Sequence, residues 1–155
     1  MPVEIERKFL VDTRGLGELP AGKRYRQGYL PAAGNISVRA RICDDAAWLT
    51  IKGETTGASR LEFEYPIPVT DASDILESLC QGSIIDKTRH LVEHAGHTWE
   101  IDVFAGDNAG LVIAEVELES EDEAVDLPGW AAGEVTQDPR YYNASLVTNP
   151  YCNWK

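Results

Sequence analysis

The chain has 155 residues, which suits one domain with a sizeable hydrophobic core, and we expect residues 1–155 to form a single domain. Its net charge of −12, from 14 basic and 26 acidic residues, argues against a nucleic-acid-binding surface, which needs a basic footprint. The sequence holds no long apolar stretch and begins with charged residues instead of an apolar signal region, so we expect a cytoplasmic protein without a membrane partner.

The first half of the chain is predicted to consist of β-strands, because polar and apolar residues alternate in short runs separated by turn residues. We expect these strands at residues 3–11, 24–30, 36–43, 47–53 and 60–67. Asp44-Asp45 is a tight connection that joins two of them into a hairpin.

The second half is predicted to combine strands with short helices. Thr70-Asp71 resembles the N-cap of a helix over residues 72–81, which Gly82 would end. Ser120 and Glu123 have the spacing of a capping box, which predicts a further short helix ended by Pro128-Gly129. The remaining elements are strands at residues 84–94, 97–104 and 111–119, and a helix-like segment near residues 144–147.

Most of the predicted strands carry charged residues two positions apart. Because side chains alternate with period 2, such residues share one face of a strand. The pattern comprises Glu4/Glu6/Lys8, Arg39/Arg41, Lys52, Glu62/Glu64, Lys87/Arg89, Glu100/Asp102 and Glu115/Glu117. Several of these strands carry a single sign, which is unusual for an ordinary solvent-exposed face, where opposite charges pair across strands. The charged faces therefore indicate a site for a metal and a polyanion.

A sheet with one charged and one apolar face can keep the charged face hydrated by closing into a barrel. Seven or eight antiparallel strands closed into a barrel would place the charges on a wet lumen and turn the apolar face outward. The predicted helices would cover part of that outer face, and a homodimer could cover the rest.

The same residues resemble a known family. The opening Glu4-x-Glu6-x-Lys8, the charged pairs that follow it, and the tail from Glu134 to Asn143 are similar to the CYTH domain, the triphosphate tunnel metalloenzyme superfamily. The similarity covers essentially the whole chain and is greatest to short bacterial inorganic triphosphatase-like members. It implies an α+β fold: an eight-stranded antiparallel β-barrel, the triphosphate tunnel, with a few covering helices, that binds a linear triphosphate with Mg²⁺ or Mn²⁺.

The resemblance also implies roles for single residues. Carboxylates suit hard divalent cations, and the matching metal ligands are Glu4, Glu6 and Glu117, with Glu115, Glu62 and Glu64 as further candidates. Arg and Lys suit phosphate oxygens, and the matching residues are Lys8, Arg39, Arg41, Lys52, Lys87 and Arg89. Tyr29 matches a tyrosine that pairs with the first-strand lysine and assists the attack of water, so Lys8 and Tyr29 are the predicted catalytic residues.

The predicted function is metal-dependent hydrolysis of a small-molecule triphosphate, with inorganic tripolyphosphate as the leading substrate. Two alternatives remain open at this point. One is a class IV adenylate cyclase, which converts ATP to cyclic AMP and pyrophosphate. The other is a non-catalytic module that binds polyphosphate or a nucleotide. No residue in the sequence identifies the organic end of a substrate.

Overall fold

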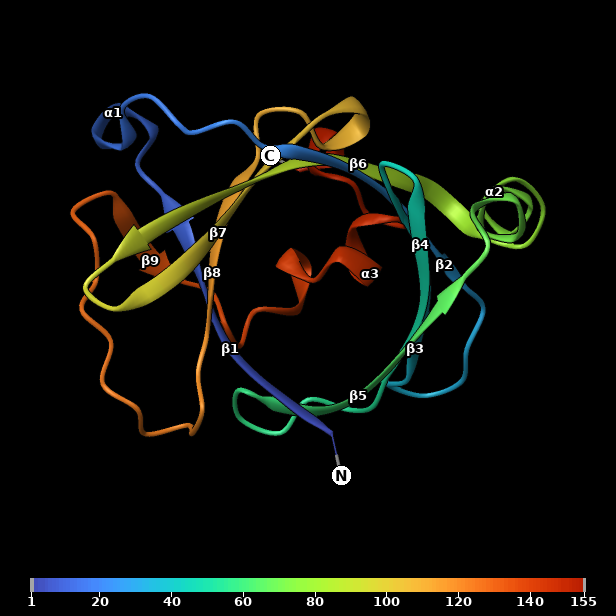
Figure 1. Cartoon of the computed structure of the whole chain (residues 1–155), viewed down its shortest axis with the longest axis horizontal. Helices are drawn as coiled ribbons and strands as arrows, with labels where there is room; N and C mark the ends of the chain where they lie inside the picture. Colours follow the sequence, from blue (N-terminus) through green and yellow to red (C-terminus); the bar gives the residue numbers. More distant parts are fainter. Residues whose placement is uncertain (1, 155) are drawn as a thin grey trace.

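A computed structural model describes residues 2–154. Within them, eight antiparallel strands form a closed barrel in the order β5-β4-β3-β2-β6-β7-β8-β1, which a pairing between β1 and β5 completes (Figure 1). The strands are β1 (Val3–Val11), β2 (Lys23–Leu30), β3 (Ser37–Cys43), β4 (Ala46–Lys52), β5 (Ser59–Ile67), β6 (Gln81–His94), β7 (His97–Phe104) and β8 (Val112–Glu117). The predicted eight-stranded α+β barrel is therefore confirmed.

A ninth strand, β9 (Ala131–Glu134), extends the sheet beyond the barrel and was not predicted. One edge of β1 pairs first with β5 and then with the segment that contains β9. The Glu6 N–H donates to the Ala58 carbonyl on the β5 side (3.2 Å), and the Lys8 carbonyl accepts from the Val135 N–H (2.8 Å). The sequence of β9 gives no signal because two alanines and a glycine show no polar–apolar alternation.

The helices are short and lie at different places around the barrel. They are α1 (Thr13–Leu16), α2 (Val69–Ser78) and α3 (Asn143–Leu146), with 3₁₀ turns at Gly106–Asn108, Pro139–Tyr141 and Tyr151–Asn153. Helix α2 lies outside the barrel wall (Figure 1) and buries Ala72 and Leu76. It begins three residues before the predicted start because Pro68, in an extended conformation, occupies the N-cap position.

The short helix predicted from Ser120 to Pro128 is wrong. The hydrogen bonds of a capped turn do form, since the Glu123 N–H donates to the Ser120 carbonyl (3.2 Å) and the Glu123 carboxylate accepts from the Glu119 N–H (2.7 Å). The chain then continues without helix, because Val125 packs against the hydrophobic cluster on the outer face of β1 and β7. Packing against the barrel outweighs a local helix signal only a few residues long.

That cluster on the outer face is the larger of two hydrophobic cores. Its buried members are Phe9, Trp99, Ile101, Ala114, Val116, Leu118 and Trp130. Trp99 is fully buried and packs edge-on against Trp130 and at a tilt against Phe9. Leu16, at the end of α1, and Leu19, in the loop that follows, cover the cluster. The apolar outer face is therefore covered on this side by segments of the same chain.

The second core lies at one end of the barrel interior and contains the C-terminal segment. Leu146 and Val147 pack there against Tyr29, Ile85, Phe104, Leu111 and Ile113. Figure 1 shows α3 inside the ring of strands when the molecule is viewed down its shortest axis. The segment around α3 therefore fills one end of the lumen, which leaves the charged part of the interior beside it.

The outer face near β5 is less covered, because α2 packs on β2, β3 and β4. Val3 and Tyr65 each keep 53% of their surface exposed. A homodimer that covers this face stays a prediction. Among residues 2–154 no helix has the length and apolar character needed to cross a membrane.

Candidate active site

The inward faces of the barrel strands enclose a cavity of about 830 Å³. Every residue predicted for the site lines it: Glu4, Glu6, Lys8, Tyr29, Arg39, Arg41, Lys52, Glu62, Glu64, Lys87, Arg89, Glu115 and Glu117. Arg7, which alternation places outside, instead forms a two-pronged ion pair with Glu134 at 3.0 and 2.8 Å. The charged face read from the sequence is therefore the lumen.

Two arginines of β3 project into the cavity at successive inward positions. The Arg39 guanidinium contacts the Thr50 hydroxyl (3.1 Å) and the Glu64 carboxylate (3.4 Å). Arg41 donates to the Gln27 side-chain oxygen (2.7 Å) and lies over the Tyr25 ring, 4.7 Å from its centroid. Burial, and then the like charges of Arg39 and Arg89, lower the pKa of Arg41 to about 10. Crowded cations of this kind favour a bound anion.

Strands β6 and β7 add a buried ion network. The Lys87 ammonium contacts Asp102 (2.8 Å) and the Asn143 side-chain oxygen (2.9 Å). Arg89 grips Asp102 with two hydrogen bonds (2.8 and 2.9 Å) and reaches Glu100 at 3.0 Å. Burial lowers the pKa of Lys87 to about 7, although Asp102 opposes the shift. Asp102 thus orients two cations, Lys87 and Arg89.

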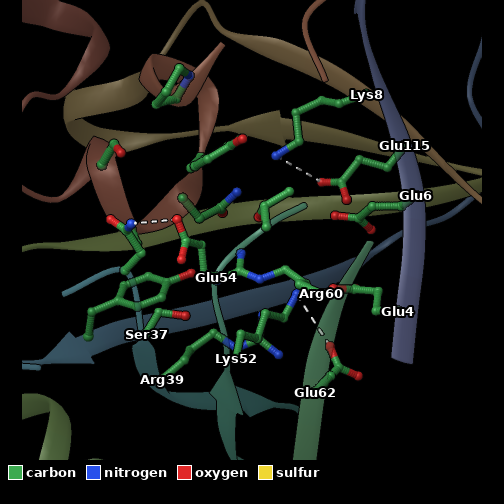
Figure 2. Close-up of a pocket in the computed structure, with 18 of the residues that line it drawn as sticks. Glu4, Glu6, Lys8, Ser37, Arg39, Lys52, Glu54, Arg60, Glu62 and Glu115 are labelled. Carbon is green, nitrogen blue, oxygen red and sulfur yellow. Dashed lines mark hydrogen bonds and ion pairs between the residues drawn. The ribbon is translucent and has the colours of Figure 1, made fainter. Parts of the chain in front are cut away.

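The acidic side of the lumen comes from β1 and β8. Glu6 lies opposite Glu117 in the strand register, and Figure 2 shows it between Glu4 and Glu115. Burial, together with the charges of Glu115 and Glu4, raises the pKa of Glu6 well above its ordinary value. Carboxylates that repel one another in this way offer the oxygen ligands that a divalent cation prefers, and such a cation would relieve their repulsion.

A lysine occupies the space between two of the predicted metal ligands. The Lys52 ammonium contacts Glu4 (2.8 Å) and Glu62 (3.3 Å), an arrangement that Figure 2 displays. Among residues 2–154 no group of three or more acidic, His or Cys side chains is spaced for a metal ion. Two of the carboxylates that would hold a metal are therefore paired with Lys52 in this structure.

Lys8 and Tyr29, which were predicted to pair, contact other groups in the structure. The Lys8 ammonium contacts the Tyr141 carbonyl (3.3 Å), approaches Glu115 (3.9 Å) and lies 5.5 Å from the centre of the Tyr142 ring. The Tyr29 hydroxyl accepts a hydrogen bond from Gln27 at 3.2 Å. Both residues line the same cavity, and their catalytic role stays a prediction.

Several lining residues were not predicted. Arg60 projects inward from β5, two residues before Glu62, and shares the alternation that identified Glu62 and Glu64, so it could have been found. The C-terminal segment contributes a further group: Thr136, Pro139, Arg140, Tyr142, Asn143, Ala144, Ser145, Thr148 and Asn149. These residues lie outside the strands, so no periodic signal marks them as inward-facing.

A closed antiparallel barrel whose lumen combines six predicted phosphate-binding cations with buried carboxylates defines a tunnel-type site for a small polyanion. Residues 2–151 match the sequence model of the CYTH domain, and the chain belongs to this family.

Two curated relatives are similar over nearly their whole lengths. The inorganic triphosphatase of Acetivibrio thermocellus is 50% identical over 155 residues, which cover 100% of this chain and 99% of the relative. The inorganic triphosphatase of Nitrosomonas europaea is 42% identical over 148 residues, which cover 93% of this chain and 96% of the relative.

Solved structures share the architecture. The crystal structure of an inorganic triphosphatase superposes with a TM-score of 0.68 at 38% identity and covers 95% of each chain. A protein of Pyrococcus furiosus, at 19% identity and a TM-score of 0.59, covers 77% of this chain and 80% of its own, and it shows the fold alone.

Proposed function

We propose that this protein hydrolyses inorganic tripolyphosphate inside its barrel, with Mg²⁺ or Mn²⁺ as cofactor. The observation that carries the proposal is the composition of the cavity, in which eight basic side chains, six of them predicted, face a group of carboxylates within about 830 Å³. The names of the two full-length relatives support the same reaction. A compact linear polyanion matches a lumen whose apolar end is already occupied by Leu146 and Val147.

The basic residues would bind and align the phosphate chain. Arg39, Arg41 and Arg89 offer planar forks that contact two phosphate oxygens at once, and Lys8, Lys52 and Lys87 offer point charges. Positioning and electrostatic stabilisation supply most of the catalysis of phosphoryl transfer, since charge spreads over the oxygens of the transferred group. Residues already fixed by Asp102 and Thr50 would make these contacts with little reorganisation.

The carboxylates would hold the metal. Glu4, Glu6, Glu115 and Glu117 form the acidic side of the lumen, and Glu62 and Glu64 extend it on β5. When bound, the metal would neutralise negative charge on the phosphate oxygens and so lower the barrier to attack by a nucleophile.

The hydrolytic step needs a positioned water molecule. Its oxygen attacks the terminal phosphorus, the bond from that phosphorus to the bridging oxygen breaks, and phosphate and pyrophosphate leave. We assign the orientation of this water to the Tyr29 hydroxyl and the acceptance of its proton to the ionised form of the same side chain, while Lys8 in the same cavity adds a positive charge to the site. Tyr29→Phe should then lower kcat at least about 10-fold with little change in KM.

Purified protein incubated with tripolyphosphate, ATP and thiamine triphosphate, each with Mg²⁺ or Mn²⁺, tests the proposal. Release of phosphate from tripolyphosphate at the highest kcat/KM is the expected result. Formation of cyclic AMP from ATP would favour the cyclase alternative instead, and binding without turnover would favour the non-catalytic module. An adenylate cyclase also needs an adenine pocket, and the apolar end of the lumen is filled by the protein's own C-terminal segment.

A further inference from the structure

Gln27 is a fully buried glutamine on β2 that forms three hydrogen bonds with three different parts of the candidate site. Its side-chain oxygen accepts from the Arg41 guanidinium at 2.7 Å. Its side-chain nitrogen donates to the Tyr29 hydroxyl (3.2 Å) and to the Asn143 side-chain oxygen (3.2 Å). Gln27 therefore touches a predicted phosphate ligand, a predicted catalytic residue and the C-terminal segment at once.

The orientation of this amide is fixed by the chemistry of its neighbours. Arg41 can only donate, so the Gln27 oxygen faces it and the amide N–H groups face the other two partners. The Asn143 oxygen also accepts from the Lys87 ammonium at 2.9 Å, and Lys87 can only donate. The two donor-only cations at the ends of the network thus determine the direction of each hydrogen bond between them.

The direction of these bonds decides what the Tyr29 hydroxyl can do. Because its oxygen accepts from Gln27, its own proton is left for another partner, and negative charge that develops on the oxygen faces an N–H donor. We propose that Gln27 is a positioning residue that aims the Tyr29 hydroxyl and the Arg41 guanidinium at the substrate and ties both to the C-terminal segment through Asn143. The inference rests on the proposed hydrolase function.

A buried glutamine could instead serve only to satisfy its neighbours. Buried polar groups need partners in any case, so removal of Gln27 would lower stability under either interpretation. The interpretations differ in whether the effect of Gln27 on turnover passes through Tyr29. A double-mutant cycle measures that coupling directly.

The experiment compares Gln27→Met, Tyr29→Phe and the double variant on tripolyphosphate with Mg²⁺, with melting temperatures as a check on folding. We expect Gln27→Met to lower kcat about 10-fold, as befits the loss of a hydrogen bond to a general acid–base group. In the Tyr29→Phe background the same change should alter kcat less than about twofold, while KM still rises through Arg41. Gln137→Met is the control, because Gln137 is exposed and donates to the Gly57 carbonyl outside the cavity lining.

Gln27→Glu keeps the shape of the side chain and provides the test if Gln27→Met fails to fold. Its carboxylate can still accept from Arg41 but cannot donate to Tyr29, so kcat should fall as far as in Gln27→Met. A wild-type kcat in Gln27→Glu would overturn the inference. So would a double variant whose loss of kcat equals the product of the two single losses. Either result would leave the proposed function standing. No turnover by the unchanged protein would overturn the proposed function, and the inference with it.

Discussion

Arg7 and Lys8 are adjacent in the sequence and yet lie on opposite sides of the barrel wall. Arg7 pairs with Glu134 on the outside, whereas Lys8 lines the cavity. The two residues carry the same charge, so the difference follows from the alternation of side chains along β1. Position on the strand therefore decides which of the basic residues can meet a substrate.

A pair of alanine substitutions tests this division. Arg39→Ala removes a buried cation of the lumen and should lower kcat/KM about 10- to 100-fold, the equivalent of a charged hydrogen bond worth roughly 1.5–3 kcal/mol. Arg7→Ala removes an outer ion pair of partly exposed groups and should leave kcat/KM within about twofold. Equal losses in steady-state assays of the two variants would show that the assignment of inner and outer faces is wrong.

Lys87 should give the activity a characteristic dependence on pH. Its pKa of about 7 means that the free protein loses this charge as the pH rises through neutrality, because burial disfavours the ammonium form. We expect kcat/KM for tripolyphosphate to fall above about pH 7, as one phosphate contact weakens. Lys87→Met should be less active throughout and should lack this limb of the profile. A wild-type profile that stays flat from pH 6 to 9 would contradict the assignment.

At the scale of elements, the C-terminal segment docks against the start of β6 at a glycine. Gly82 has φ +68°, and the next residue, Ser83, donates its N–H to the Val147 carbonyl at 2.9 Å. A Cβ atom on Gly82 would lie far inside the van der Waals distance of that carbonyl oxygen. The sequence predicts that Gly82 ends a helix, whereas the structure places it in β6, where it permits the close approach of two segments.

Gly82→Ala should therefore loosen the C-terminal segment and disturb Asn143 in the lumen. Gly106→Ala is a matched control, because Gly106 has a similar φ of +62° and open space where a Cβ would lie. Both variants carry the backbone strain of about 1 kcal/mol, but only Gly82→Ala adds the clash. We expect a larger loss of unfolding free energy in urea, and a marked loss of kcat, for Gly82→Ala alone. Matching behaviour of the two variants would show that this docking is unimportant.

The elements that could be predicted are those with one wet and one apolar face. The barrel strands show period 2 because each separates the charged lumen from an apolar outer layer, and that pattern located twelve of the thirteen proposed site residues. Tyr29 was identified only through the resemblance to the CYTH family. The helix-like segment predicted near residues 144–147 is α3, but its place inside the barrel depends on long-range contacts such as Lys87 to Asn143. Strand β9 spans four residues without alternation and is held by its pairing with β1. Gln27 follows the alternation of β2, but its importance depends on partners that come together only in the folded chain.

At the scale of the whole molecule, the barrel concentrates negative charge that folding alone does not favour. Glu6 is half-buried beside Glu4 and Glu115 in a protein of net charge −12. Its raised pKa means that the ionised form is disfavoured in the folded state, so ionised Glu6 lowers the free energy of unfolding of the metal-free protein.

Glu6→Gln should consequently raise the melting temperature of the protein in EDTA by a few degrees, while it lowers triphosphatase activity. Excess Mg²⁺ should raise the melting temperature of the wild-type protein through preferential binding to the folded state, and less so that of the variant. Differential scanning calorimetry with and without EDTA measures both effects. Full turnover of the wild-type protein in EDTA would contradict the role given to the carboxylates.

The pairing of β1 also has a consequence for synthesis of the protein on the ribosome. Strand β1 emerges before β5, β8 and β9, with which it pairs, so its last partner lies about 120 residues further along the chain. Contacts of such long sequence separation form late and slow the folding of a domain. Until Glu134 leaves the exit tunnel, the apolar side of β1 has no complete cover, and the nascent chain should depend on chaperones over that interval.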